Sequence, residues 1–292
     1  MALPATVATP ASLEKSAEPV DTVSLTGNRS FTDADGNLIV RQGDSSRLGR
    51  LVDSSAAGTG PADCQVVHQN QTPEGQRGYA VFKGKDIRTD HLTIPLANIT
   101  GIEAPELSKP GAENYFADAW KDGREKAAED QGTSADKLPR DAFAMAVNSQ
   151  DARSQDRLHI HTDRLDPQLG QQLKQQVDDG AVASDHWTDV KPVHGHQYRA
   201  LWVDGTDLTQ NPFQLVHDQV VADNGGGKAG EAAAGKQMGM HSLAVVGETD
   251  AQGRPGFIIL DGRFGKDAKM PDGPHDSGSA EEWLAGHADA PP

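Results

Sequence analysis

The sequence predicts an α+β fold in which a mainly antiparallel sheet is packed against helices. Strand-like segments occur in neighbouring pairs joined by short polar turns, which is the pattern of antiparallel hairpins. Two amphipathic helices lie between these pairs. Both ends of the chain are poor in large apolar residues and rich in small residues, proline and charge, which is typical of segments that flank a folded domain.

The first predicted hairpin pairs GYAVFK (78–83) with HLTIPL (91–96) across the polar turn GKDIRTD. In AFAMAVNS (142–149), large apolar residues alternate with alanines, and RLHIHTDRL (157–165) resumes an alternation after a polar loop. These two segments are expected to pair as antiparallel strands. Further strands are expected at 196–203, 241–248 and 256–263, with the turn TDAQGRP joining the last two.

Two segments have the spacing of amphipathic helices. In residues 114–132, Phe116, Ala119 and Trp120 recur at helical spacing, so these side chains are expected in the core. Residues 166–179 (DPQLGQQLKQQVDD) carry apolar residues at a spacing of four and are predicted to form a second helix.

The composition along the chain predicts three regions. Residues 1–60 are expected to be a flexible arm, with SSAAGTGPAD (54–63) as the linker that ends it. Residues 61–268 are expected to form the folded domain. The remaining residues, 269–292, are expected to be a disordered tail in which AEEWLAG has the pattern of one transient turn.

Charge and hydropathy exclude several classes of function. With 27 Lys and Arg against 43 Asp and Glu, the formal net charge is -16, which opposes general binding to nucleic acid or anionic membranes. No apolar run approaches the roughly 20 residues that span a bilayer, and the N-terminus lacks the features of a signal peptide. Cys64 is the single cysteine of the sequence, so an internal disulfide and a multi-cysteine metal site are excluded.

The segment RLHIHTDRL carries the most suggestive chemistry. On a strand, His159, His161 and Asp163 share one face and the residues between them share the other. Such a pair of histidines serves structure, binds a metal with the help of a carboxylate such as Asp163, or performs nucleophilic and acid–base chemistry. The strand by itself leaves these three alternatives open.

Two amides upstream favour chemistry at a phosphate. Asn148 ends the preceding strand and Gln155 lies in the connecting loop, so the hairpin is expected to return both to the imidazoles. Amides can hold the oxygens of a phosphoryl group while a neutral imidazole attacks phosphorus.

The block VNSQDARSQDRLHIHT resembles the signature of the histidine-triad superfamily of nucleotide hydrolases and transferases. A longer match is to the bacterial CDP-diacylglycerol diphosphatases, because IPLANITGIEAPEL, NYFADAWKDGR, HGHQYRALWV, MGMHSLAVV and GFIILDGR follow in the order of that family. The resemblance covers roughly residues 60 to 263. It implies a HIT-like α+β domain whose antiparallel sheet carries the histidine strand, with helices packed on one side.

The resemblance also implies roles for individual residues. His161 would attack phosphorus to give a phosphohistidine intermediate, His159 would orient it, and Asn148 and Gln155 would contact phosphate or the ring. Asp163 stands at the third histidine position of the superfamily and is a candidate substrate-binding residue, where it would act as the leaving-group acid or accept a hydrogen bond from a histidine.

Two more residues match positions of the diphosphatases. Lys83 resembles a lysine that would neutralise phosphate charge. His196 resembles a family histidine and is expected to have a structural, hydrogen-bonding role at the substrate site. The mechanism that the resemblance implies uses no metal and no cofactor.

The implied activity is cleavage of a pyrophosphate-linked nucleotide such as CDP-diacylglycerol to CMP and phosphatidate. Members of the family commonly begin with a membrane anchor, whereas this chain begins with the arm, so we expect a soluble protein in the bacterial cytoplasm or secreted into a host cell. The arm resembles type III export signals, and in a secreted effector the same site would transfer a nucleotidyl or phosphoryl-linked group to a host protein.

Two other functions remain alternatives at this point. The first is a non-catalytic nucleotide-binding module that keeps the site without turnover. The second is a two-histidine phosphoesterase, since HLTI at 91–94 fits one His-x-Thr-x element, although the sequence has no second copy of it.

Overall fold

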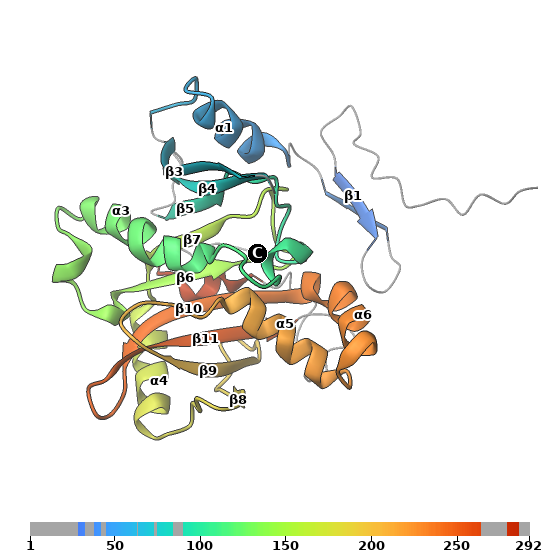
Figure 1. The fold of residues 1–292 in the computed structure, drawn as a ribbon. Coiled ribbons are helices and arrows are strands. Elements are labelled where there is room, and N and C mark those ends of the chain that lie inside the picture. The colour runs from blue at the N-terminus through green and yellow to red at the C-terminus, as the bar shows by residue number, and fades with distance from the viewer. Residues whose placement is uncertain are drawn as a thin grey trace, which may run out of the picture.

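The computed structural model describes residues 29–32, 38–41, 45–62, 64–72, 75–83, 90–263 and 279–285 (Figure 1). Within these ranges, one mixed α+β unit is built around an antiparallel sheet of nine strands in the order β3-β4-β5-β7-β6-β10-β11-β9-β8. The strands are β3 (Cys64–Thr72), β4 (Gly75–Lys83), β5 (His91–Pro95), β6 (Phe143–Val147), β7 (Ile160–Arg164), β8 (Thr188–Asp189), β9 (Tyr198–Asp204), β10 (His241–Thr249) and β11 (Pro255–Arg263). A separate pair, β1 (Arg29–Thr32) and β2 (Leu38–Arg41), completes the described strands.

The predicted strand pairs are confirmed. β4 pairs with β5, β6 with β7, and β10 with β11, in each case antiparallel. The sequence did not predict β3 or β8, which pair with β4 and β9 near the two edges of the sheet. The histidine strand β7 lies inside the sheet, between β5 and β6, so both of its sides are hydrogen-bonded.

Helices cover both faces of the sheet. The first face carries α2 (Tyr115–Asp118), η2 (Ala119–Gly123), α3 (Arg124–Glu129), α5 (Pro212–Asp223) and α6 (Gly227–Gln237), and the second carries α1 (Arg47–Ala56), α4 (Pro167–Asp178) and η6 (Ala280–Trp283). The expectation of helices on one side is therefore wrong. Its cause is that inner strands such as β6 bury residues on both faces, so both faces of the sheet need a cover.

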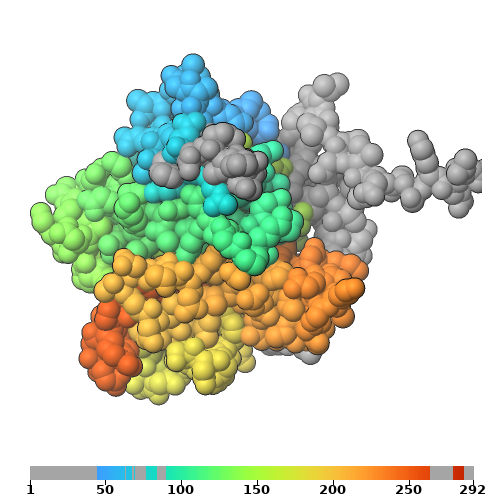
Figure 2. Space-filling model, in the orientation of Figure 1, coloured from blue at the N-terminus to red at the C-terminus, as the bar shows by residue number. Residues whose placement is uncertain are grey.

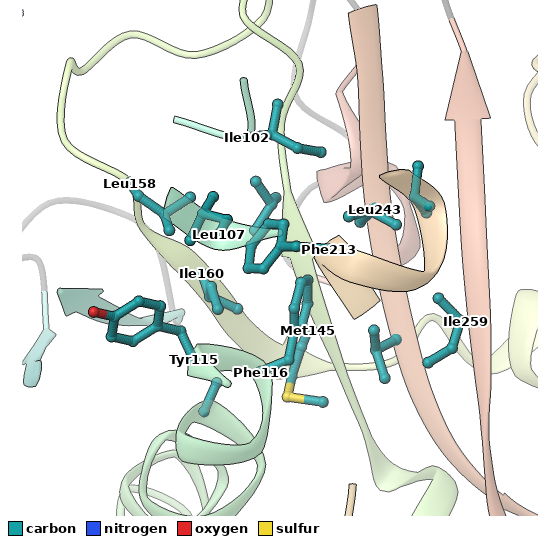
Figure 3. Close-up of a cluster of buried hydrophobic side chains, with 14 of the residues drawn as sticks. Ile102, Leu107, Tyr115, Phe116, Met145, Leu158, Ile160, Phe213, Leu243 and Ile259 are labelled. Carbon is teal, nitrogen blue, oxygen red and sulfur yellow. The ribbon is translucent and has the colours of Figure 1, made fainter. Parts of the chain in front are cut away.

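The first face holds the largest core cluster. Figure 3 shows Leu158 and Ile160 pointing into this cluster together with Phe116, Met145 and Phe213. The predicted helix over 114–132 is confirmed, and its centre is a π-helical turn, η2, flanked by α2 and α3. On the face shown in Figure 2, the green atoms of this region meet the orange atoms of α5 and α6, neither of which was predicted.

The second face is built from smaller strand residues and α4. The predicted apolar spacing of that helix is confirmed, since Leu169, Leu173 and Val177 pack on the alanines of β6. Short 3-10 turns connect the larger elements: η1 (Pro105–Leu107), η3 (Ala135–Lys137), η4 (Arg140–Ala142) and η5 (Met238–Met240). Among the helices of the described ranges, none is both long enough and apolar enough to cross a bilayer.

The two flanking regions differ from the prediction. Within the expected arm and linker, α1 packs Leu48 and Val52 against β4 and β5. Within the expected tail, η6 buries Trp283 and Leu284 completely against the second face. In both segments a few apolar side chains dock on the sheet, and that contact outweighs a polar composition. The rest of the arm and tail lies outside the described residues, apart from the backbone of β1 and β2.

Candidate active site

The histidine strand presents its polar residues to the second face. His161 lies opposite Leu92 of β5 and Ala146 of β6, which both face the α1 and α4 side. His159 and Asp163 share that face by alternation, and all three side chains are buried. The prediction of one polar face and one apolar face on this strand is confirmed.

His161 is held between two carboxyl groups that are far apart in the sequence. Its Nδ1 contacts an oxygen of Asp90, the residue directly before β5, at short hydrogen-bond distance. Its Nε2 lies 3.2 Å from Oε1 of Glu281 in η6. A carboxylate at Nδ1 fixes the orientation of the ring and stabilises a positive charge on it.

His159 is held differently. Its Nδ1 lies 2.7 Å from the backbone carbonyl oxygen of Arg157, and only a nitrogen that carries hydrogen can donate to a carbonyl. The Nε2 of His159 therefore has the lone pair. Burial first, and the neighbouring His161 second, lower the pKa of His159 to about 4, so this ring is neutral at pH 7. The two rings meet edge to face, with centroids 4.9 Å apart.

Asn148, at the end of β6, contacts the same carboxyl oxygen of Glu281 that lies near Nε2 of His161. Its Nδ2 donates to Oε1 of Glu281 at 2.5 Å, and its Oδ1 accepts from the backbone N–H of Ala280 at 3.0 Å and from Ser279 at 3.2 Å. Asn148 thus joins the end of β6 to the segment 279–281.

Gln155 has a different place. Its Oε1 accepts from the backbone N–H of Leu48 at 2.9 Å, and its Nε2 donates to the carbonyl oxygen of Ser154. Gln155 therefore supports the first turn of α1, which covers the same face of the sheet further along.

Lys83 lies on the opposite face of the sheet from His161. In the register of β4 and β5 it pairs with His91, and alternation turns both side chains towards α3, where Asp130 contacts each of them. The structure therefore does not bring Lys83 to the imidazoles, although the sequence resemblance assigned it to the same phosphate. His91, the histidine of the HLTI element, pairs with Thr162 of the histidine strand, so its side chain lies on the opposite face of the sheet from His161.

Asp163 and His196 both lie on the second face. Asp163 accepts a hydrogen bond from the backbone N–H of Arg164 at 2.7 Å. His196 contacts Glu282 through Nδ1 at 2.8 Å, and Tyr198 donates to the same carboxylate at 2.5 Å. His196 therefore binds the segment that carries Glu281, which agrees with a hydrogen-bonding role.

Sequence reasoning missed Asp90 and Glu281. Asp90 was interpreted as the last residue of a polar turn. The signal that could have identified it is its position directly before the predicted strand 91–96, which lies next to the histidine strand. Glu281 stood in the expected tail, where the paired Trp and Leu of AEEWLAG were the sign of a docked segment. No group of three or more histidine, cysteine or acidic side chains suited to a metal ion occurs within the described ranges.

Comparison with known proteins gives a consistent result. A family model described as CDP-diacylglycerol pyrophosphatase matches residues 50–285, a range that includes Asp90, the histidine strand and Glu281. The CDP-diacylglycerol pyrophosphatase of Yersinia pestis is 34% identical over 174 residues, which are 58% of this chain and 59% of that protein. The alignment thus covers less than two thirds of the relative's length.

Proposed function

We propose that this chain, which belongs to the CDP-diacylglycerol pyrophosphatase family, hydrolyses a pyrophosphate-linked nucleotide such as CDP-diacylglycerol to CMP and phosphatidate. The observation that carries the proposal is His161, buried and oriented by Asp90, beside Asn148 and the neutral ring of His159. An oriented imidazole with an amide donor next to it suits attack on a phosphoryl group.

The proposed reaction has two steps. The lone pair of Nε2 of His161 attacks one phosphorus, the P–O bond to the other phosphate breaks, and a phosphohistidine remains. Water then attacks the same phosphorus and the P–N bond breaks, which restores the ring. Asp90 holds the ring through Nδ1 in both steps, and the Nδ2 donor of Asn148 is available to a phosphoryl oxygen.

The ring of His159 supports this arrangement and is the second possible site of attack. Its edge-to-face contact limits the rotation of His161, and its own Nε2 has a lone pair. Identifying the phosphorylated residue separates the two roles. We expect the phosphoryl group on His161; a phosphoryl group on His159 would make His159 the nucleophile and His161 the supporting ring.

The test is incubation of the purified protein with CDP-diacylglycerol and with soluble nucleotide diphosphate esters, followed by mass analysis of the products. We expect CMP and phosphatidate from the wild type and no turnover from His161→Ala. The exposed His186, which pairs with its neighbour Asp185, provides the matched control His186→Ala. Full turnover by His161→Ala would rule out His161 as the nucleophile.

The same assay separates the alternative functions. An acceptor protein added to the reaction gains mass if the group on the histidine is transferred to protein instead of water. Binding of the nucleotide without any product identifies a binding module. Each of these outcomes contradicts hydrolysis as the proposed function.

A further inference from the structure

The segment 279–285 closes the site from the far end of the sequence. Its backbone continues beside the end of β7: Asp166 donates to the carbonyl oxygen of Trp283 at 2.9 Å, and Ala285 donates to that of Arg164 at 2.8 Å. Trp283 is completely buried and packs edge to face on Tyr198. These contacts hold the segment in place without any help from Glu281.

Glu281 points from this segment to the atom that the proposed reaction uses. Its Oε1 lies 3.2 Å from Nε2 of His161 and 2.5 Å from Nδ2 of Asn148. The side chain of Glu281 is only 10% exposed, so its carboxyl group interacts with these partners more strongly than it would in water.

The contact with Nε2 has a consequence for the proton of the ring. Nδ1 of His161 faces Asp90 and needs its hydrogen for that bond. In a neutral ring Nε2 would then have a bare lone pair, which repels a carboxylate. The 3.2 Å approach of Nε2 to Oε1 of Glu281 is not aligned as a hydrogen bond. It is favourable only if one of the two groups is protonated, as an imidazolium beside a carboxylate or a neutral ring beside a carboxyl group.

We propose that Glu281 is a catalytic residue of this site, the general base that takes the proton from Nε2 of His161 before the ring attacks phosphorus. This inference rests on the proposed function, in which Nε2 is the attacking atom. It assigns chemistry to a residue that contacts the reacting nitrogen, whereas Asp90 acts by orienting the ring.

The protons balance over one turnover. The proton of Nε2 moves to Glu281, the freed lone pair forms the P–N bond, and the protonated carboxyl group gives its proton to the oxygen of the leaving phosphate. In the second step Glu281 takes a proton from the attacking water, the P–N bond breaks, and the proton returns to Nε2. The sum is one pyrophosphate bond and one water converted to two phosphate monoesters.

Glu281→Gln tests the proposal because the amide keeps the size and the oxygen acceptor for Asn148 but cannot take a proton. We expect kcat to fall about 10²- to 10⁴-fold. Asp90, Glu281 and His159 face the ring of His161, and loss of one of the two carboxylates makes the ring release its proton at lower pH. In the wild type the reactive pair already holds one proton, so the acidic limb of the pH–rate profile reports protonation of Glu281. In Glu281→Gln the ring must lose its proton before it attacks, so the acidic limb should move to higher pH.

Two further variants complete the experiment. Glu281→Asp keeps the carboxyl group and should retain more activity than Glu281→Gln, while the exposed Glu106→Gln is a matched control that should behave as the wild type. Hydrogen exchange of residues 279–285 in each variant checks that the segment stays docked. Wild-type kcat and an unchanged pH profile in Glu281→Gln would refute the role of Glu281.

The outcomes separate this inference from the proposed function. If the wild type turns over, His161→Ala does not, and Glu281→Gln is unaffected, only the role of Glu281 fails. If no variant hydrolyses any substrate, NMR titration of the His161 ring still compares wild type with Glu281→Gln. If the His161 ring titrates identically in the wild type and in Glu281→Gln, the interaction of Glu281 with the ring proton is refuted. A lower titration midpoint of the ring in Glu281→Gln would support it.

Discussion

Two histidines two positions apart have different chemistry because their Nδ1 atoms face different acceptors. A backbone carbonyl fixes the tautomer of His159 and leaves the ring neutral, whereas Asp90 gives His161 a negatively charged partner. Both residues are histidines, and both side chains lie on the same face of the sheet. Their environment decides which ring has a carboxylate partner and which has only a backbone carbonyl.

The burial of His159 predicts a pH-dependent stability. Because its pKa is lowered from 6.5 to about 4 in the folded state, the unfolded state binds more protons between these values, and stability falls as the pH decreases. As the pH falls from 7 to 5, His159 should lower the free energy of unfolding of the wild type by about 2 kcal/mol. Urea unfolding of the wild type and of His159→Gln at both pH values measures this loss. If the free energy of unfolding fell equally in the two proteins between pH 7 and pH 5, the prediction would be contradicted.

At the scale of elements, η6 is short but indispensable to the site as described. It brings Glu281 to His161, Glu282 to His196, and Trp283 into the core on the second face. A turn of four residues has little stability of its own, so its docking depends on the burial of its apolar side chains.

Trp283→Ala should therefore release the segment. We expect a loss of about 3–5 kcal/mol in the free energy of unfolding, since a large side chain leaves a cavity against Tyr198. Turnover should fall as well, because Glu281 is no longer held near Nε2. Urea unfolding, protease sensitivity of the tail and kcat report these effects.

The matched control for this prediction is Trp187→Ala, at a partly exposed tryptophan. It should cost less stability and leave the tail protected. A segment that stays protected in Trp283→Ala would show that the hydrogen bonds of Asn148 and the backbone suffice to hold it.

At the scale of the whole molecule, the sheet collects residues that the chain keeps far apart. Asp90 and His161 are 71 positions apart, and Asn148 and Glu281 are 133 apart. The neighbouring strands β5, β7 and β6 bring Asp90, His161 and Asn148 together. η6 adds Glu281 from the second face. The site therefore depends on the pairing of three adjacent strands and on the docking of η6 against the second face.

The net charge of -16 predicts how the molecule meets a lipid substrate. Turnover of CDP-diacylglycerol in anionic vesicles should be slower than in neutral detergent micelles, because the protein and the surface repel each other. Added salt should narrow the difference, since the Debye length falls to about 8 Å at 0.15 M. A soluble nucleotide diphosphate ester is the control, and vesicle rates that do not respond to salt would contradict this account.

The sequence by itself determined the local features of this protein. The strand pairs, two of the helices and the two faces of the histidine strand all follow from side-chain alternation and from short connections, which act between near neighbours. The family resemblance likewise depended on blocks of local sequence, and the family match agrees with it.

Only the tertiary structure decided the partners of the imidazoles and the place of the flanking segments. The register of β4 and β5 decides on which face of the sheet the side chain of Lys83 lies. Gln155 contacts α1 because that helix docks on the sheet. Asp90 and Glu281 meet His161 through contacts between distant segments, which no local pattern encodes. Burial of a few apolar side chains brought α1 and η6 into the fold, and through η6 it supplied the second carboxyl group of the site.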